Sequence, residues 1–404
     1  MSISQLSRDL SESATLRLNK IALNLRELGQ PIIHLGGGEP KTKMPIGAVR
    51  AASAKITSAN VRYTPEDGTP ELKKAIIRYT EDHYNKEVSP ENVIASNGAK
   101  QSLSVLMQAI LNPQDEVIIN SPYWVSYPDM AKICYAKPII IRPESGRFHP
   151  TIGDIENAIT SYTKLIIINS PSNPTGVLYS EKFIKEIIEF AEKKGIYLVM
   201  DDIYNRLIFD GKQPISAYKF SSENMNKTKL IIVNGISKIY AMTGFRLGYT
   251  LANPYIVKAM SKIQGHTTSC PSSLTQAAAV GALNGVQSGV ESLRLTLENN
   301  RNILMQELNT FEGVHVRKPD GTFYSFPDFS NYNKDSEALS NFLLEKVQVV
   351  TVPGKDFGAE GHLRISFCGS IKEIREGIAR IKWALGQGPN EIMIGERRLV
   401  RDWV

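Results

Sequence analysis

The chain has 404 residues, of which 42% are hydrophobic, so it is long and apolar enough to form two packed domains. Its 47 basic and 41 acidic side chains give a formal net charge of +6, but no block of five like charges occurs, so nucleic-acid binding is not indicated. Three widely spaced cysteines, no apolar leader and no run of about 20 apolar residues predict a cytoplasmic protein without a membrane span.

Short apolar runs alternate with helical patterns through the first 290 residues. Five runs lack polar alternation, as do strands that are buried on both faces; they lie at 92–96, 115–120, 164–169, 196–200 and 229–234. Between them, helices are expected at 100–111 and 180–195, the second with Ser180 as its N-cap and Gly195 as its stop. This alternation predicts an α/β fold with a mostly parallel sheet and helical crossovers.

The pattern changes near residue 290. A long charged helix is expected at 291–311, followed by short strands and a second helix that ends near residue 385. We therefore expect a large domain at 46–289 and a smaller α+β domain built from 1–45 and 290–404. Residues 386–404 would be an additional C-terminal tail.

Polar and aromatic residues follow the predicted strands, at the edge where α/β sheets bind ligands. After the first strand, Gly98, Ala99 and Lys100 begin a helix whose amide groups and dipole suit an anion such as phosphate. The segments after the other strands contain a second set of candidates: Trp124, Asn173, Asp201, Tyr204, Ser237, Lys238 and Arg246.

Together, these residue types suit pyridoxal phosphate. A lysine with a lowered pKa can form a Schiff base, an arginine binds phosphate as a fork, and a buried carboxylate can hold a pyridinium proton. We expect Lys238 to take the aldehyde, Asp201 to meet the ring nitrogen and Trp124 to stack on the ring. Asn173 and Tyr204 would bind the phenolic oxygen. The phosphate would lie on Gly98, Ala99, Lys100, Ser237 and Arg246.

Each of these residues also has an ordinary structural interpretation. A lysine after a strand is usually a solvated cation, an arginine is usually a salt-bridge partner, and an aspartate is often a cap. Trp124 could belong to the core. The six histidines show no HExxH or similar spacing, so no metal site is predicted.

Six segments with distinctive motifs follow one another along the chain: VRYTPEDGTPELKKAI (61–76), SPYWVSYPDM (121–130), NSPSNPTGVLY (169–179), DDIYNRL (201–207), NGISKIYAMTGFRLGY (234–249) and HLRISF (362–367). In this order they resemble the class I pyridoxal-phosphate aminotransferases, and most closely the bacterial aspartate aminotransferase branch called subgroup Iβ. The resemblance covers roughly residues 15–385 and implies a three-layer fold-type-I large domain with a smaller α+β domain.

The resemblance implies an aminotransferase that works by a ping-pong mechanism. The commonest substrates of the branch are aspartate as the donor and 2-oxoglutarate as the acceptor, and this is the pair that we expect, although no side chain singles out one donor. By position, Lys238 would be the Schiff-base lysine, Asp201 the pyridinium partner and Arg246 a phosphate ligand.

The resemblance also implies how substrate and subunits are arranged. Arg364 would clamp the substrate α-carboxylate, and Tyr63 would reach the phosphate from a neighbouring subunit, so the expected assembly is a homodimer with shared active sites. Further substrate contacts are expected from Gly38, Trp124 and Asn173.

Two departures from the family pattern bear on the substrate. Lys41 and Lys43 replace the acids that usually follow the glycine-glutamate-proline motif; they could favour an anionic substrate side chain or simply be solvated. Ala99 stands where glycine is common. Aromatic, alanine and prephenate aminotransferases share the motifs, as do C–S β-lyases, so these alternatives stay open. A DNA-binding regulator and a dinucleotide-dependent oxidoreductase rank well below them.

Overall fold

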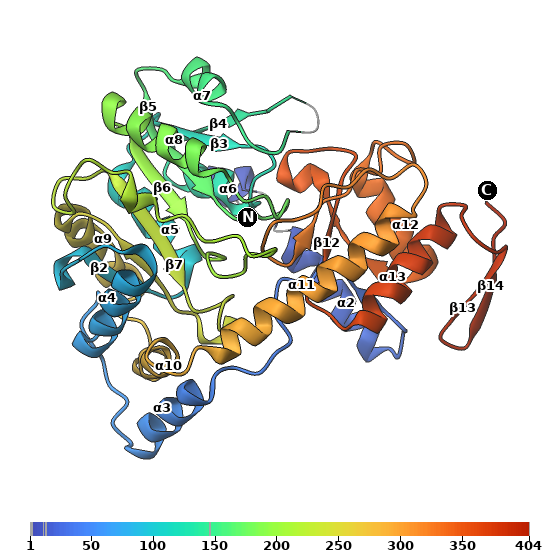
Figure 1. The fold of residues 1–404 in the computed structure, drawn as a ribbon, viewed down its shortest axis with the longest axis horizontal. Coiled ribbons are helices and arrows are strands. Elements are labelled where there is room, and N and C mark those ends of the chain that lie inside the picture. Colours follow the sequence, from blue (N-terminus) through green and yellow to red (C-terminus); the bar gives the residue numbers. More distant parts are fainter. Residues whose placement is uncertain (1–2, 11, 13, 145–146, 404) are drawn as a thin grey trace.

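The centre of the molecule is a seven-stranded sheet in the order β2-β8-β7-β6-β5-β3-β4 (Figure 1). The computed structural model describes residues 3–10, 12, 14–144 and 147–403. β8 is antiparallel to both of its neighbours, and all other adjacent strands are parallel. The strands are β2 Val93–Ser96, β3 Glu116–Asn120, β4 Lys137–Ile141, β5 Thr163–Asn169, β6 Tyr197–Asp201, β7 Leu230–Gly235 and β8 Gly248–Leu251.

The predicted α/β architecture is confirmed, and all five predicted strands are present. Two strands of this sheet were missed. β4 is an edge strand that begins with Lys137 and Pro138 and is only partly buried, and its apolar run is limited to the three isoleucines at 139–141. β8 is four residues long and lies between β2 and β7, a place set by tertiary pairing.

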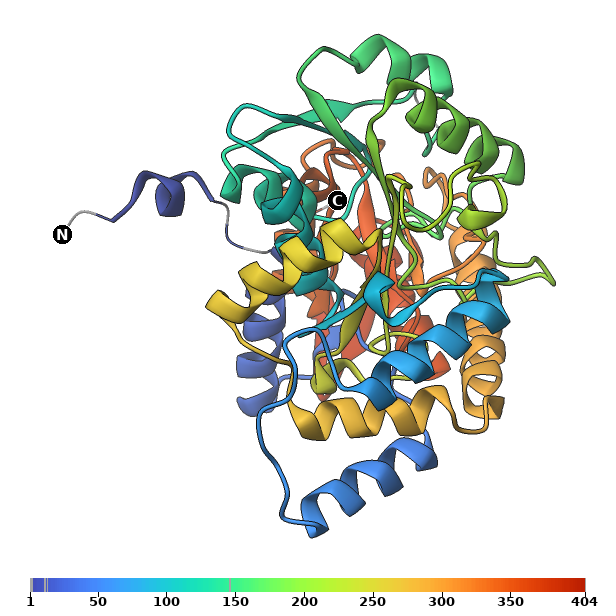
Figure 2. The same ribbon diagram turned by 90° about the vertical axis from the view of Figure 1, so that its left-hand side faces the viewer.

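Helices cover both faces of the sheet, which explains the uninterrupted apolar strands (Figures 1 and 2). In β5, Leu165 and Ile167 pack into the core on one side, while Ile166 and Ile168 pack into the core on the other. The first core includes residues of α5 Ala99–Ile110, α6 Ser126–Ile133 and α9 Pro254–Thr267. The second includes residues of α4 Pro70–Tyr84, α7 Ile152–Ala158 and α8 Glu181–Lys194.

The caps of α8 follow the sequence prediction. The Ser180 hydroxyl accepts a hydrogen bond from the Phe183 amide at 3.2 Å. Gly195 ends the helix in the left-handed region with φ of 66°, where glycine is favoured because it has no Cβ.

Smaller sheets and the remaining helices form the rest of the molecule. β1 Ile33–His34 pairs in parallel with β10 Val349–Val350. A three-stranded antiparallel sheet joins β11 Val352–Pro353, β12 Leu363–Ser366 and β9 Tyr324–Ser325. The helices are α1 Gln5–Asp9, α2 Ala14–Glu27, α3 Ile46–Thr57, α10 Ser273–Leu283, α11 Ser288–Asn309, α12 Ser336–Val347 and α13 Ile371–Ala384, with short 3-10 turns at Pro90–Asn92, Ala217–Lys219, Thr243–Phe245 and Gly354–Phe357.

The C-terminal tail is a hairpin of β13 Glu391–Ile394 and β14 Arg397–Val400. It is anchored to α13 rather than free. The indole of Trp403 packs edge-on against Trp383 with 5.2 Å between ring centroids, and its Nε1 donates to the Ala384 carbonyl at 3.1 Å. In the described ranges, no helix has both the length and the apolarity needed to cross a membrane.

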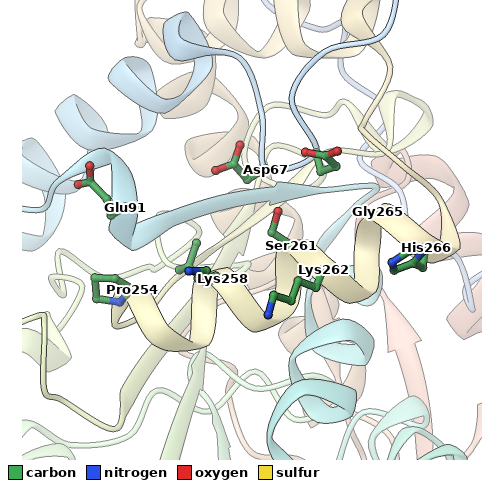
Figure 3. Close-up of a pocket in the computed structure, with 10 residues that line it drawn as sticks. Asp67, Glu91, Pro254, Lys258, Ser261, Lys262, Gly265 and His266 are labelled. Atoms are coloured by element: carbon green, nitrogen blue, oxygen red, sulfur yellow. The ribbon is translucent and has the colours of Figure 1, made fainter.

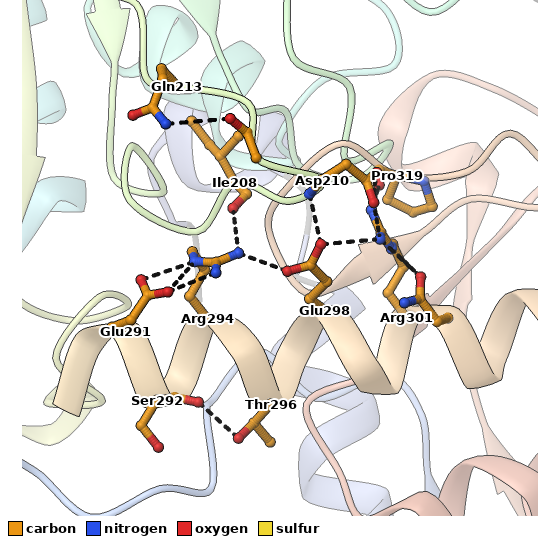
Figure 4. Close-up of polar contacts among 12 residues, drawn as sticks. Ile208, Asp210, Gln213, Glu291, Ser292, Arg294, Thr296, Glu298, Arg301 and Pro319 are labelled. Carbon is orange, nitrogen blue, oxygen red and sulfur yellow. Dashed lines mark hydrogen bonds and ion pairs between the residues drawn. The ribbon is translucent and has the colours of Figure 1, made fainter. Parts of the chain in front are cut away.

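A network of charged side chains joins α11 to the loop after β6 (Figure 4). The side chain of Arg301 is 0% exposed and donates to both carboxylate oxygens of Asp210, at 2.7 and 2.8 Å, and to the Pro319 carbonyl at 3.0 Å. Its guanidinium also lies 4.8 Å from the ring centroid of Phe209. These contacts hold the long helix against the part of the chain that carries the central sheet.

Replacing Asp210 by alanine is expected to lower the free energy of unfolding by about 2–3 kcal/mol, because the buried Arg301 cation then loses its hydrogen-bonded carboxylate and keeps only the longer ion pair with Glu298, at 3.7 Å. The effect should fall below that of a fully buried pair, since the Asp210 side chain is 36% exposed. The shift in the urea midpoint, followed by tryptophan fluorescence, measures the change. Glu291→Ala removes a more exposed ion pair on the same helix and should cost less than about 1 kcal/mol. Equal effects of the two substitutions would contradict this prediction.

Candidate active site

A cavity of about 500 Å³ opens at the carboxyl ends of the parallel strands β5, β6 and β7. Most of the residues predicted from the sequence line it together, although they come from distant parts of the chain. They are Gly38, Ala99, Lys100, Trp124, Asn173, Asp201, Tyr204, Ser237, Lys238, Arg246 and Arg364. The location agrees with the general preference of open α/β sheets for ligands at this edge.

Lys238 follows β7 and extends toward the N-terminal segment of the chain. Its Nζ donates a hydrogen bond to the Gly38 carbonyl at 2.7 Å. Loss of hydration lowers the pKa of Lys238 to about 8, and the nearby carboxylate of Glu39 opposes this shift only in part. A substantial fraction of this amine is therefore neutral, and nucleophilic, near physiological pH.

Asp201 lies at the end of β6 and is almost completely buried. Its carboxylate accepts a hydrogen bond from the Tyr127 hydroxyl at 2.6 Å and from the Ile203 amide at 3.3 Å. Burial raises the pKa of Asp201 to about 6, and the hydrogen bond from Tyr127 limits this increase. The site thus holds a carboxylate that a positively charged group would stabilise.

The start of α5 and Arg246 form a seat for an anion. Gly98 is the N-cap of the helix with φ of 89°, and a Cβ at this position would lie 2.6 Å from Nη2 of Arg246. Glycine therefore allows the guanidinium to approach the backbone amides of the first helical turn, which have no partners within the helix. Arg246 and the hydroxyl-bearing Ser237 both line the cavity. Amides, guanidinium and hydroxyl together suit a phosphate group.

Arg364 is a buried cation that lines the cavity. The residue is 2% exposed, and its guanidinium lies 4.2 Å from the Tyr324 ring centroid and 5.0 Å from that of Phe357. Nη1 and Nη2 donate to two neutral acceptors, Asn173 Oδ1 and the Gly36 carbonyl, each at 3.0 Å. Within the described residues, Arg364 forms no ion pair with a carboxylate. An anionic ligand would stabilise a buried cation of this kind.

Comparison with known proteins identifies the family. The sequence pattern of the family described as aminotransferase class I and II matches residues 30–381. This chain belongs to that aminotransferase family. The prediction made from the six segments is confirmed, and the protein is an aminotransferase.

Relatives match this aminotransferase over nearly their whole length. An aspartate aminotransferase from Bacillus subtilis is 37% identical over 379 residues, which cover 92% of this chain and 96% of the relative. An asparagine–oxo-acid transaminase from Streptococcus mutans is 38% identical over 381 residues, covering 93% and 96%. Among solved structures, the aspartate aminotransferase from Rhizobium meliloti has a TM-score of 0.90 at 35% identity and covers 95% of this chain and 99% of that one. The fold-type-I prediction is thereby confirmed.

Several cavity residues of the aminotransferase were not predicted from the sequence. Tyr127 carries a visible signal, because it follows Trp124 by three residues at the start of a helix and therefore lies on the same face. The others had no local signal, since tertiary packing brings them to the cavity: Asn19, Glu39, Leu103, Val125, Asn169, Ile203, Thr243, Gly244 and Tyr324.

Four predicted residues are not among those that line the cavity. Gly98 lies beside Arg246 without being part of the lining, and Tyr63 is 93% exposed in the single chain. Lys41 forms an ion pair with Glu373 at the start of α13, with Nζ 2.8 Å from each carboxylate oxygen, and Lys43 is exposed. Neither lysine is among the residues that line the cavity, and Glu373 compensates the charge of Lys41, so an effect of these lysines on substrate choice stays a prediction.

The aminotransferase also has a more open hollow of about 580 Å³, between α9 and the loop before α4 (Figure 3). Asp67 and Glu91 lie on one side of it, and Lys258 and Lys262 on the other. None of the candidate cofactor- or substrate-binding residues predicted from the sequence lines this hollow. Cavity volume alone therefore does not identify the candidate active site. Buried ionisable residues with shifted pKa values do identify it.

Proposed function

We propose that this aminotransferase transfers the amino group of L-aspartate to 2-oxoglutarate, with pyridoxal phosphate as its cofactor. The observation that carries the proposal is the uncompensated Arg364 cation in the same cavity as the Lys238 amine and the Asp201 carboxylate. The names of the relatives support aspartate as the donor.

The residues of the cavity fit pyridoxal phosphate. The start of α5, Ser237 and Arg246 would hold the phosphate, Asp201 would hold the protonated ring nitrogen, and Trp124 would cover the ring. Asn173 and Tyr204 would bind the phenolic oxygen. The bound cofactor supplies an electron sink that makes the substrate Cα proton removable.

The protein supplies proton transfer and orientation. In this proposal, Lys238 binds the aldehyde in the resting enzyme, and its Nζ later takes the proton from the substrate Cα as a general base. The lowered pKa suits this role because a neutral amine is available near pH 8. Arg364 binds the α-carboxylate through its guanidinium and fixes the Cα beside Lys238.

A second cation in the cavity favours a dicarboxylic substrate. Lys100 lines the same cavity as Arg364, with its Nζ 5.0 Å from the Trp124 ring centroid. The phosphate already has Arg246 and the amides at the start of α5. We therefore extend the role predicted for Lys100, from phosphate contact to attraction of the substrate side-chain carboxylate.

Replacing Lys100 by glutamine is expected to raise the KM for aspartate about tenfold or more, because one hydrogen bond to a charged group is lost. The KM for alanine, which has no second carboxylate, should change less than about threefold. Steady-state kinetics with both donors measures the difference, and Lys100→Arg should retain most of the preference for aspartate. If the KM values for both donors rise equally and pyridoxal phosphate binds more weakly, Lys100 contacts only the phosphate.

We also propose a homodimer in which Tyr63 of each subunit reaches the phosphate bound by the other. The 93% exposure of this tyrosine in the single chain supports the idea, because a large aromatic side chain is seldom so solvated without a partner. Sedimentation equilibrium measures the subunit number. Mixing inactive Lys238→Ala with inactive Tyr63→Ala chains should restore part of the activity through hybrid dimers.

The proposed function is tested by following the visible absorbance of the enzyme loaded with pyridoxal phosphate. Addition of aspartate alone should convert the cofactor band once and release one equivalent of oxaloacetate per site; 2-oxoglutarate should then restore the band. If another amino acid gives this result and aspartate does not, the donor is wrong. Continuous formation of pyruvate and ammonia without an oxo acid would instead indicate a C–S β-lyase.

A further inference from the structure

His34, at the end of β1, connects two parts of the active-site wall. Its Nδ1 is 3.1 Å from the amide nitrogen of Gly36, and its Nε2 is 2.7 Å from Oδ1 of Asn19 on α2. Asn19 lines the cavity, and the Gly36 carbonyl accepts a hydrogen bond from Arg364. Neither this histidine nor Asn19 was assigned a role in the sequence analysis.

The contacts of His34 determine which ring nitrogen carries the proton. A backbone amide can only donate, so the Gly36 N–H requires Nδ1 to be the acceptor. The proton of the neutral ring is therefore on Nε2, which donates to Asn19. Burial, together with the positive charges of Arg26, Arg364 and Lys41, lowers the pKa of His34 to about 4, and the ring stays neutral near pH 7.

This tautomer also fixes the side-chain amide of Asn19. Because Nε2–H of His34 donates, the atom of Asn19 that faces it must be the acceptor Oδ1. The donor Nδ2 then points away from His34. Within the part of the chain whose side chains are described, Nδ2 has no hydrogen-bond partner, and Asn19 contributes to the lining of the cavity. A donor is thus presented to whatever the cavity binds.

We propose that Asn19 donates a hydrogen bond from Nδ2 to the side-chain carboxylate of the substrate, and that His34 is the positioning residue that holds this amide in the donating orientation. The α-carboxylate is left to Arg364. This assignment rests on the proposed function, because it requires a substrate with two carboxylates. It gives α2, which lies outside the central sheet domain, a direct part in substrate choice.

Asn19→Asp is the decisive substitution. The aspartate keeps the shape of the side chain and the oxygen that accepts from His34, but it turns the donor toward the cavity into a negatively charged acceptor. We expect the KM for aspartate and the Kd for maleate, a dicarboxylate without an amino group, to rise about 100-fold, while the KM for alanine changes less than threefold. Asn19→Ala should raise the KM for aspartate about tenfold. Asn24→Asp adds the same charge at an exposed position on the same helix and should leave all three values unchanged.

Two substitutions of His34 separate its two hydrogen bonds. In His34→Gln, the amide nitrogen can take the place of Nε2 and keep donating to Asn19, whereas in His34→Asn the side-chain oxygen can accept from Gly36 but does not reach Asn19. The measured quantity is the KM for aspartate relative to the KM for alanine. We expect this ratio to change less than about threefold in His34→Gln and to rise about tenfold in His34→Asn. The reverse order would overturn the positioning role.

The outcomes distinguish this proposal from the function on which it rests. If the unmodified enzyme fails to convert aspartate or to bind maleate, the proposed substrate is wrong. Suppose that the unmodified enzyme does both. If Asn19→Asp then raises the KM for aspartate and the KM for alanine equally, or changes neither KM, Asn19 has only a structural role. A nitrogen NMR spectrum of His34 with the proton on Nδ1 would also overturn the proposal.

Discussion

Replacing Lys238 by alanine is expected to lower the kcat for transamination of aspartate by about 10⁴-fold, since a general base at the reacting carbon contributes up to about this factor. The variant should also lose the absorbance band of the cofactor bound to the protein. Fluorescence should still report weak binding of pyridoxal phosphate, because the start of α5 and Arg246 are unchanged. Stopped-flow mixing and steady-state kinetics measure the two effects.

The pH dependence provides a second check on Lys238. Its pKa is lowered to about 8, and only the neutral amine attacks an aldehyde, so the rate of cofactor capture should rise with pH and level off above about pH 8. Lys229→Ala, at the opposite end of β7, serves as a control and should leave this profile unchanged. A capture rate that rises until pH 10 would show an ordinary, hydrated lysine.

Replacing Asp201 by asparagine is expected to lower kcat by about 10²- to 10³-fold, the usual effect of removing one preorganised electrostatic contact from a reaction centre. The asparagine can still accept from Tyr127, but it has no negative charge to hold a proton on the cofactor ring nitrogen. Cofactor affinity should fall less than kcat. In the enzyme without cofactor the pKa of Asp201 is raised to about 6, so the affinity for the cofactor should decline as pH falls through this value.

Asp202→Asn is the matched control for this prediction. Asp202 is adjacent in sequence and equally buried, and burial raises its pKa to about 7, but it does not line the cavity. We expect its substitution to lower stability while changing kcat less than about fivefold. If both variants lose activity to the same extent, the effect comes from disturbing the end of β6 rather than from the ring nitrogen.

The sequence was sufficient to predict five of the seven strands of the central sheet and most of the candidate residues at its carboxyl edge. These five strands are buried on both faces and therefore appear as unbroken apolar runs, and the candidate site residues Asp201, Ser237 and Lys238 lie at or just after their carboxyl ends. The local sequence alone predicted that a helix begins at Gly98, and in the structure Gly98 is the N-cap of α5.

Other parts of the site could not be inferred from local patterns. β8 is antiparallel between two parallel strands, and only its pairing with β2 and β7 reveals this. Asn19 is a polar residue on an amphipathic helix, and tertiary packing brings it to the cavity. The role of Lys41 was left open between a substrate contact and a solvated cation, and no local pattern predicted its ion pair with Glu373.

The contact between Arg364 and Gly36 has a consequence for biosynthesis. The two residues are 328 positions apart in the chain. In the same way, β1 cannot pair with β10 until residues 349–350 have been synthesised. The central sheet, by contrast, is complete once residue 251 has been made. Because chains fold from the N-terminus as they leave the ribosome, we expect an unfinished chain to form the proposed phosphate seat long before Arg364 can complete the cavity. Under the proposed function, catalysis would then begin only when synthesis is nearly complete.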